Sequence, residues 1–72
     1  MNEFKALVLA HYNFTNKNGK EINTTKCRVS MGEYGYFDIC TELANEKALF
    51  SEIKVELLYD NKKNKLIISK IV

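Results

Sequence analysis

The chain has 72 residues, of which 46% are hydrophobic and 28% charged, and its formal net charge is +2 at pH 7. This length predicts one domain, residues 1–72, whose stability alone is expected to be marginal. No apolar run reaches the roughly 18 residues of a membrane span, and no basic-then-apolar leader precedes the domain, so a cytoplasmic protein without membrane contact is expected. Two cysteines and one histidine are too few for a zinc site, so neither a metal nor a cofactor is expected.

The small net charge hides a segregation of charge along the chain. Residues 15–31 hold four cations and one acid, a net of +3, and residues 60–72 hold the same numbers. Residues 32–59 between them hold two cations and six acids, a net of −4. Two basic segments flanking an acidic one indicate a polyanion partner more clearly than the total does.

Apolar and polar side chains alternate in five segments, which is typical of β-strands. These segments are residues 4–15, 21–31, 36–41, 54–59 and 65–72. In the first, strict alternation places six side chains on one face: Phe4, Ala6, Val8, Ala10, Tyr12 and Phe14. Apolar residues also occupy the other face in mid-strand, and a strand buried on both sides usually bends through a barrel or sandwich.

Residues 24–41 are expected to form a β-hairpin on which the functional interpretation depends. A two-residue turn at Gly32-Glu33 would pair Arg28 with Phe37 and mix charge with core. A three-residue turn, Gly32–Tyr34, pairs Val29 with Phe37 and separates the two faces, so this register is predicted. Cys27 then lies in the core, and the outer face carries Lys26, Arg28, Ser30, Tyr36, Asp38 and a more accessible Cys40.

The segment after the third strand changes character. Residues 43–50 are mostly good helix formers without glycine, and Thr41 can serve as an N-cap, so a short helix at Leu43–Phe50 is predicted. The element order is then β-β-β-α-β-β. This is the order of the OB-fold, an all-β, five-stranded barrel with one short helix between strands 3 and 4, which here would plug one end. Small β-barrels of the SH3 type also have five strands, but they lack this helix.

Catalytic chemistry finds little support in the sequence. His11 is the only histidine, and it lies in mid-strand beside apolar neighbours, which is typical of a surface or interface histidine. Neither a nucleophile elbow nor a glycine-rich phosphate loop is present. No catalytic residue, no small-molecule substrate and no enzymatic activity are therefore expected.

The residues of the second and third strands suit single-stranded nucleic acid. Such binding needs cations for the backbone and flat rings for the bases. The predicted nucleic-acid-binding residues are Lys17, Lys20, Lys26, Arg28, Tyr34 and Tyr36. Lys26, Arg28 and Tyr36 share a face because alternate residues of paired strands point the same way.

Three groups of residues resemble the filamentous-phage helix-destabilising proteins, which are small OB-fold dimers that coat single-stranded DNA. They are Gly19-Lys20, the run Cys27-x-Val29-x-Met31-Gly32 followed by Tyr34, and the closing Leu66-Ile67-Ile68-x-Lys70-Ile71-Val72. The resemblance implies a DNA-wing lysine at Lys20 and a base-stacking tyrosine at Tyr34. Ile22 and Arg28 replace aromatic residues of that family, which implies a binder that depends more on charge.

The hypothesis that follows is a sequence-tolerant single-stranded DNA-binding protein of a phage or mobile element, acting as a homodimer. Dimerisation is expected because apolar residues occupy both faces of the first and last strands. Two alternatives remain open at this stage. One is a small protein-interaction or inhibitory module whose tyrosine face docks a protein, and the other is an OB-fold protein that binds RNA.

Overall fold

Five antiparallel β-strands make up the fold of the computed structural model, which describes residues 3–72. They are β1 (Glu3–Thr15), β2 (Glu21–Ser30), β3 (Tyr36–Thr41), β4 (Glu52–Asp60) and β5 (Lys65–Ile71). One turn of 3-10 helix, η1 (Gly32–Tyr34), lies between β2 and β3. The predicted strands are thus confirmed.

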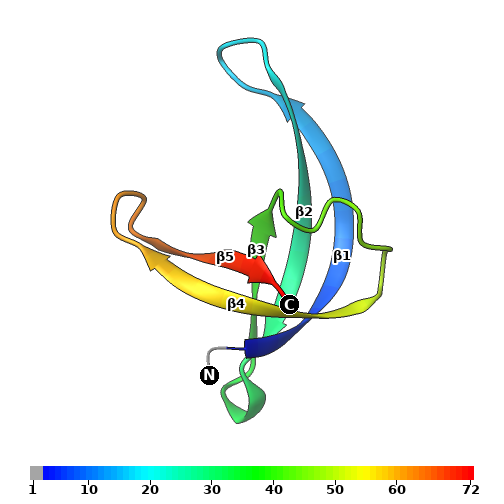
Figure 1. Ribbon diagram of the computed structural model, residues 1–72, viewed down its shortest axis with the longest axis vertical. Helices are drawn as coiled ribbons and strands as arrows, with labels where there is room; N and C mark the ends of the chain where they lie inside the picture. The colour runs from blue at the N-terminus through cyan, green and yellow to red at the C-terminus, as the bar shows by residue number, and fades with distance from the viewer. Residues whose placement is uncertain (1–2) are drawn as a thin grey trace.

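The sheet order is β3-β2-β1-β4-β5, so the first strand lies at the centre. The sheet curls until its two edge strands, β3 and β5, contact one another, as Figure 1 shows. Within residues 3–72 no hydrogen-bonded ladder joins these edges, and the barrel is therefore nearly closed. The OB-fold-like, all-β barrel expected from the element order is confirmed.

A register shift between Val8 and Ala10 bends β1 and reverses the side chains that follow. Ala6 and Val8 are buried before it, whereas Tyr12 and Phe14 are 44% and 50% exposed after it. The expectation that all of these side chains share one face is therefore wrong, because a bulge inserts one residue and changes the parity of the alternation. Apolar residues on both faces of mid-β1 mark the position of this bend.

The β2–β3 hairpin has the register predicted from its hydrophobic pattern. Val29 pairs with Phe37 and Cys27 pairs with Ile39. The Met31 amide donates to the Gly35 carbonyl at 2.7 Å and closes the three-residue turn. Cys27 is fully buried and its thiol is free, while Cys40 is exposed, as this register requires.

The predicted helix at Leu43–Phe50 is absent, because residues 42–51 form a series of turns. Besides turn bonds within the segment, such as the one from the Lys47 amide to the Ala44 carbonyl (3.1 Å), several of its polar groups bind the barrel. Asn45 Nδ2 donates to the Asn23 carbonyl (2.9 Å), and the Phe50 amide donates to the Val8 carbonyl (2.7 Å). Phe50 has a φ of 62°, which no α-helix allows. A segment of eight residues gains little from helix propensity alone, so these tertiary bonds prevail.

The core is small and is filled mainly by β-branched and other compact side chains. Val8, Val29 and Val55 are fully buried, and Ala44 from the 42–51 segment closes the core at one end. Burying each valine contributes about 1.5–3 kcal/mol. Among residues 3–72, no helix is long and apolar enough to cross a membrane.

Candidate nucleic-acid interface

Alternate residues of β2 and β3 form an outer face on the barrel, which we call the β2–β3 face. Its members are Lys26, Arg28, Ser30, Tyr36, Asp38 and Cys40. The ladder places Lys26 opposite Cys40, Arg28 opposite Asp38 and Ser30 opposite Tyr36. Their side chains leave the sheet in the same direction because the strand period is two.

Asp38 binds both cations of this face. Arg28 Nε donates to Asp38 Oδ1 at 2.9 Å and Nη2 to Oδ2 at 3.4 Å, while Lys26 Nζ lies 3.7 Å from Oδ2. The hydrogen bond from Arg28 lowers the pKa of Asp38, and the same bond raises the pKa of Arg28. Two cations and one carboxylate give the β2–β3 face a net charge of +1. The face is therefore less basic than it would be with Lys26 and Arg28 alone.

Tyr36 supplies a flat surface next to these charges. Its ring is 65% exposed, and the Arg28 guanidinium carbon lies 4.5 Å above the ring centroid. Asp38 fixes the guanidinium plane in this position. An aromatic ring and an ordered guanidinium group are both surfaces on which a nucleobase can stack.

The other predicted residues lie at the two ends of the molecule. Lys17 and Lys20 belong to the β1–β2 loop, residues 16–20, at the top of Figure 1. Asn16 Oδ1 shapes this loop by accepting bonds from the amides of Asn18 and Lys20, at 2.9 and 3.0 Å. Tyr34 lies in η1 at the opposite end and is 85% exposed. The structure thus brings Lys26, Arg28 and Tyr36 together and separates Lys17 and Lys20 from Tyr34 along the length of β2.

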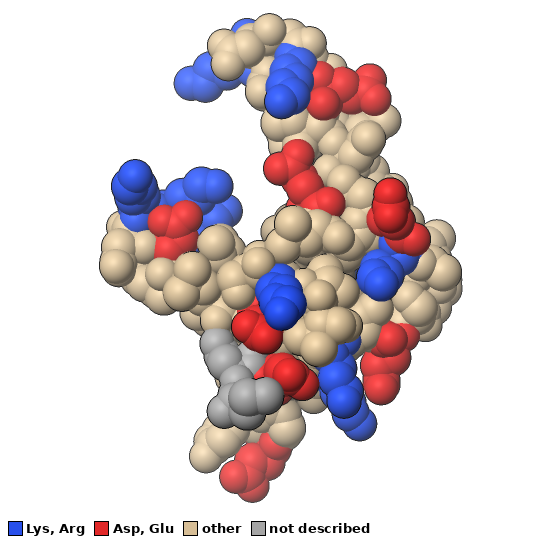
Figure 2. All heavy atoms as spheres, viewed as in Figure 1, with Lys and Arg blue, Asp and Glu red and all other residues tan. Residues whose placement is uncertain are grey.

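A second group of lysines was not among the predicted site residues. Lys62 and Lys63 occupy the β4–β5 loop, and Lys65 begins β5. Asp60 Oδ1 accepts bonds from the amides of Lys62 (2.9 Å) and Lys63 (3.2 Å), which folds the loop tightly. Figure 2 shows basic residues at the tips of this hairpin and of the β1–β2 hairpin, on either side of a hollow. The +3 charge of residues 60–72 was the available signal, but only the fold places it opposite β2.

The hollow contains a cleft of about 450 Å³, which we call the lysine cleft. Lys63 and Lys65 line one side, and Phe14 and Ile22 line the other. The remaining lining residues are Thr24, Cys40, Thr41, Glu42, Leu43, Ile67 and Ile68. Half-exposed apolar side chains beside lysines provide both stacking surface and charge, which is the pair of features that single strands require.

Cys40 connects the lysine cleft to the β2–β3 face, because it belongs to both. Its Sγ lies 2.8 Å from the hydroxyl of Tyr12 on β1. This hydrogen bond, together with a smaller effect of burial, raises the pKa of Tyr12. Tyr12 therefore stays neutral at physiological pH and provides another half-exposed ring at the junction.

His11 has a structural role in this arrangement. Its Nε2 donates to the Lys47 carbonyl at 2.6 Å, and its Nδ1 lies 2.7 Å from Thr25 Oγ1. The ring thereby ties the 42–51 segment to β1 and β2. In the part of the chain that is described, no three His, Cys, Asp or Glu side chains are arranged to hold a metal ion.

Comparisons of the chain with protein-family models, with curated proteins and with solved structures find no match. The functional assignment therefore depends on the residues of the interface itself.

Proposed function

We propose that this protein binds single-stranded DNA with little sequence preference, along a path from the lysine cleft to the β2–β3 face. The observation that carries the proposal is the cleft itself, where Lys63 and Lys65 lie across from Phe14 and Ile22. Cations for phosphates thereby occur within one concave surface together with an aromatic ring, Phe14, on which a base can stack.

The length of the path suits several nucleotides. Ile22 lines the cleft at one end of β2, and Ser30 ends the strand beside Tyr36. Eight residues of extended chain cover about 26 Å. A single strand of several nucleotides can extend over this distance, which is compatible with the roughly 4–16 nucleotides that OB-folds bind.

Two further features support the proposal. OB-folds bind oligonucleotides through strands 2 and 3 together with the loops after strands 1 and 4. In this chain the two loops carry Lys17, Lys20 and Lys63, strand 2 carries Lys26, and Lys65 follows at the start of β5. The resemblance of Gly19–Tyr34 to the filamentous-phage helix-destabilising proteins indicates the same class of partner. We include in the proposal a homodimer in the cytoplasm, acting for a phage or mobile element.

Fluorescence anisotropy with short labelled strands of DNA, RNA and duplex DNA tests this function at about 50 mM and about 200 mM salt. Single-stranded DNA is expected to bind most tightly. The double variant Lys63→Ala, Lys65→Ala is expected to flatten the log–log salt slope by about 1.4, because each phosphate contact contributes about 0.7 for single strands. The matched control is Lys47→Ala, Lys70→Ala, which removes the same charge outside the cleft.

Equal loss of affinity in both double variants would mean that only overall charge matters and would contradict the proposed path. Tighter binding of RNA than of DNA would show that RNA, and not DNA, is the preferred ligand. No binding to any strand by the folded protein would favour the protein-interaction module.

A further inference from the structure

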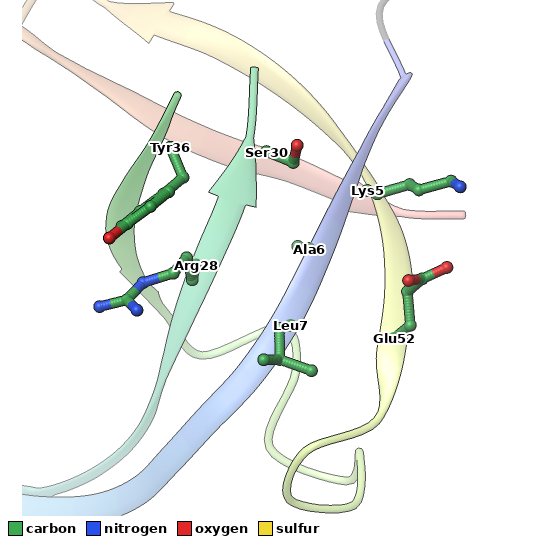
Figure 3. Close-up of a pocket in the computed structure, with 7 residues that line it drawn as sticks. All are labelled: Lys5, Ala6, Leu7, Arg28, Ser30, Tyr36 and Glu52. Atoms are coloured by element: carbon green, nitrogen blue, oxygen red, sulfur yellow. The ribbon is translucent and has the colours of Figure 1, made fainter. Parts of the chain in front are cut away.

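A second hollow lies on the outer face of the barrel beside Arg28 and Tyr36. This hollow, which we call the Leu7 pocket, has a volume of about 270 Å³ and crosses four strands. Figure 3 shows Arg28 and Tyr36 along one side, Lys5 and Glu52 along the other, and Ala6, Leu7 and Ser30 between them. Of its seven residues, only Arg28 and Tyr36 belong to the predicted site.

The middle of the Leu7 pocket is apolar and accessible. Leu7 is 37% exposed although it lies at the centre of the sheet, where β2 and β4 flank it on either side. The neighbouring Arg28 is held by Asp38 and lies over Tyr36, so this side of the pocket is ordered. A flat ring placed on Leu7 would therefore meet a preformed surface.

The polar groups at the edge of the pocket restrict what that ring can be. Glu52 forms no side-chain hydrogen bond or ion pair with any of residues 3–72, and its carboxylate can only accept hydrogen bonds. Ser30 Oγ accepts a bond from the Gly32 amide at 3.4 Å, which leaves its own hydrogen to donate. A carboxylate repels phosphates, so a nucleic-acid ligand must present a donor to Glu52.

Nucleobases differ in this respect. Cytosine and adenine carry an exocyclic amino group, and Glu is a recognised acceptor for the cytosine N4 amine. Thymine and uracil present carbonyl oxygens at the corresponding position, and these would face the carboxylate unfavourably. An amide at position 52 would remove the distinction, because it both donates and accepts.

We propose that the Leu7 pocket holds one base of the bound strand and that Glu52 selects a base with an exocyclic amino group over thymine. This inference rests on the proposed function, to which it adds a preference at a single nucleotide. Lys5, at the rim beside Glu52, lies where it can bind an adjacent phosphate.

The test compares oligo(dC) with oligo(dT) of equal length, since these strands carry the same charge and similar rings. Wild-type protein is expected to bind oligo(dC) about tenfold more tightly, the discrimination typical of one well-placed polar contact. In Glu52→Gln the ratio is expected to fall to about one. In Glu56→Gln, which removes the same charge from the same strand outside the pocket, the ratio should persist.

The outcomes separate the two proposals. Equal binding of both strands by wild-type protein, or an equal gain for both strands in Glu52→Gln, would overturn the pocket assignment while single-strand binding itself stands. No binding of either strand would refute the proposed function together with the pocket. Glu52 is exposed and Glu56 is half-buried, and glutamine keeps the size of both side chains, so both variants are expected to fold, which matching thermal melting curves would verify.

Discussion

Asp38→Asn is expected to strengthen binding to single-stranded DNA, because it removes a negative charge from the centre of the proposed interface. Asp38 engages Arg28 at 2.9 Å and Lys26 at 3.7 Å and cancels one of their two charges. Asparagine keeps the size of the side chain but not its charge. The net charge of the β2–β3 face then rises from +1 to +2.

The magnitude follows from counterion release. One additional phosphate contact steepens the log–log salt slope by about 0.7 for single strands. A fourfold increase in salt, from about 50 to about 200 mM, should then reduce the advantage of the variant over wild type by about 2.6-fold. The stacking of Arg28 on Tyr36 affects affinity at all salt concentrations alike, so the slope isolates the charge effect.

The same contacts determine how the affinity difference between Asp38→Asn and wild type depends on pH. Because Arg28 lowers the pKa of Asp38, the carboxylate stays charged from pH 8 down past the usual Asp value of about 3.9. The difference between variant and wild type should therefore be constant from pH 5 to 8. The stability that the ion pair contributes is present above the unfolded-state pKa and is lost as pH falls through the lowered value.

Anisotropy titrations at four or more salt concentrations measure the slope. The control is Glu46→Gln, which removes a negative charge at an exposed position of the 42–51 segment. An unchanged slope in Asp38→Asn would refute the placement of DNA on the β2–β3 face. An identical change in Glu46→Gln would show that overall charge alone is responsible.

The remaining predictions concern stacking, thiols, the 42–51 segment and assembly. Tyr36→Ala should weaken single-strand binding by about 1–3 kcal/mol without changing the salt slope, because stacking releases no counterions; a flatter slope in the titration would contradict this. Cys40 should react with a thiol reagent in the native protein, whereas Cys27 should react only after unfolding, because it is buried and burial raises its pKa. Peptide mass spectrometry identifies which cysteine is labelled. His11→Ala should lower the free energy of unfolding in urea by about 1–3 kcal/mol through two lost hydrogen bonds, and an unchanged midpoint would disprove that role. Sedimentation equilibrium at tens of micromolar should report a dimer, and a monomer there would count against the exposed apolar surface as an interface.

Features that depend on short-range periodicity could be predicted from the amino-acid sequence. Alternation in the 24–41 hairpin allowed only one register with a continuous apolar face, which predicted the pairing of Val29 with Phe37 and the burial of Cys27. Arg28 and Asp38 could be placed opposite each other for the same reason. The pattern of five strands likewise predicted an all-β barrel, although the helix that completed the predicted OB-fold order is absent.

Features that depend on contacts between distant segments could not be predicted in this way. Residues 43–50 have helix propensity, yet bonds to β1 and β2 hold them in turns, and no local rule includes those bonds. The bulge after Val8 reverses the faces of β1 because the barrel must bend there. The β4–β5 lysines lie across the lysine cleft from Phe14 because β4 pairs with β1 and brings β5 round to β3. Lys63 and Lys65 are about 50 residues away from Phe14 in sequence, yet all three line one cleft of the nearly closed barrel.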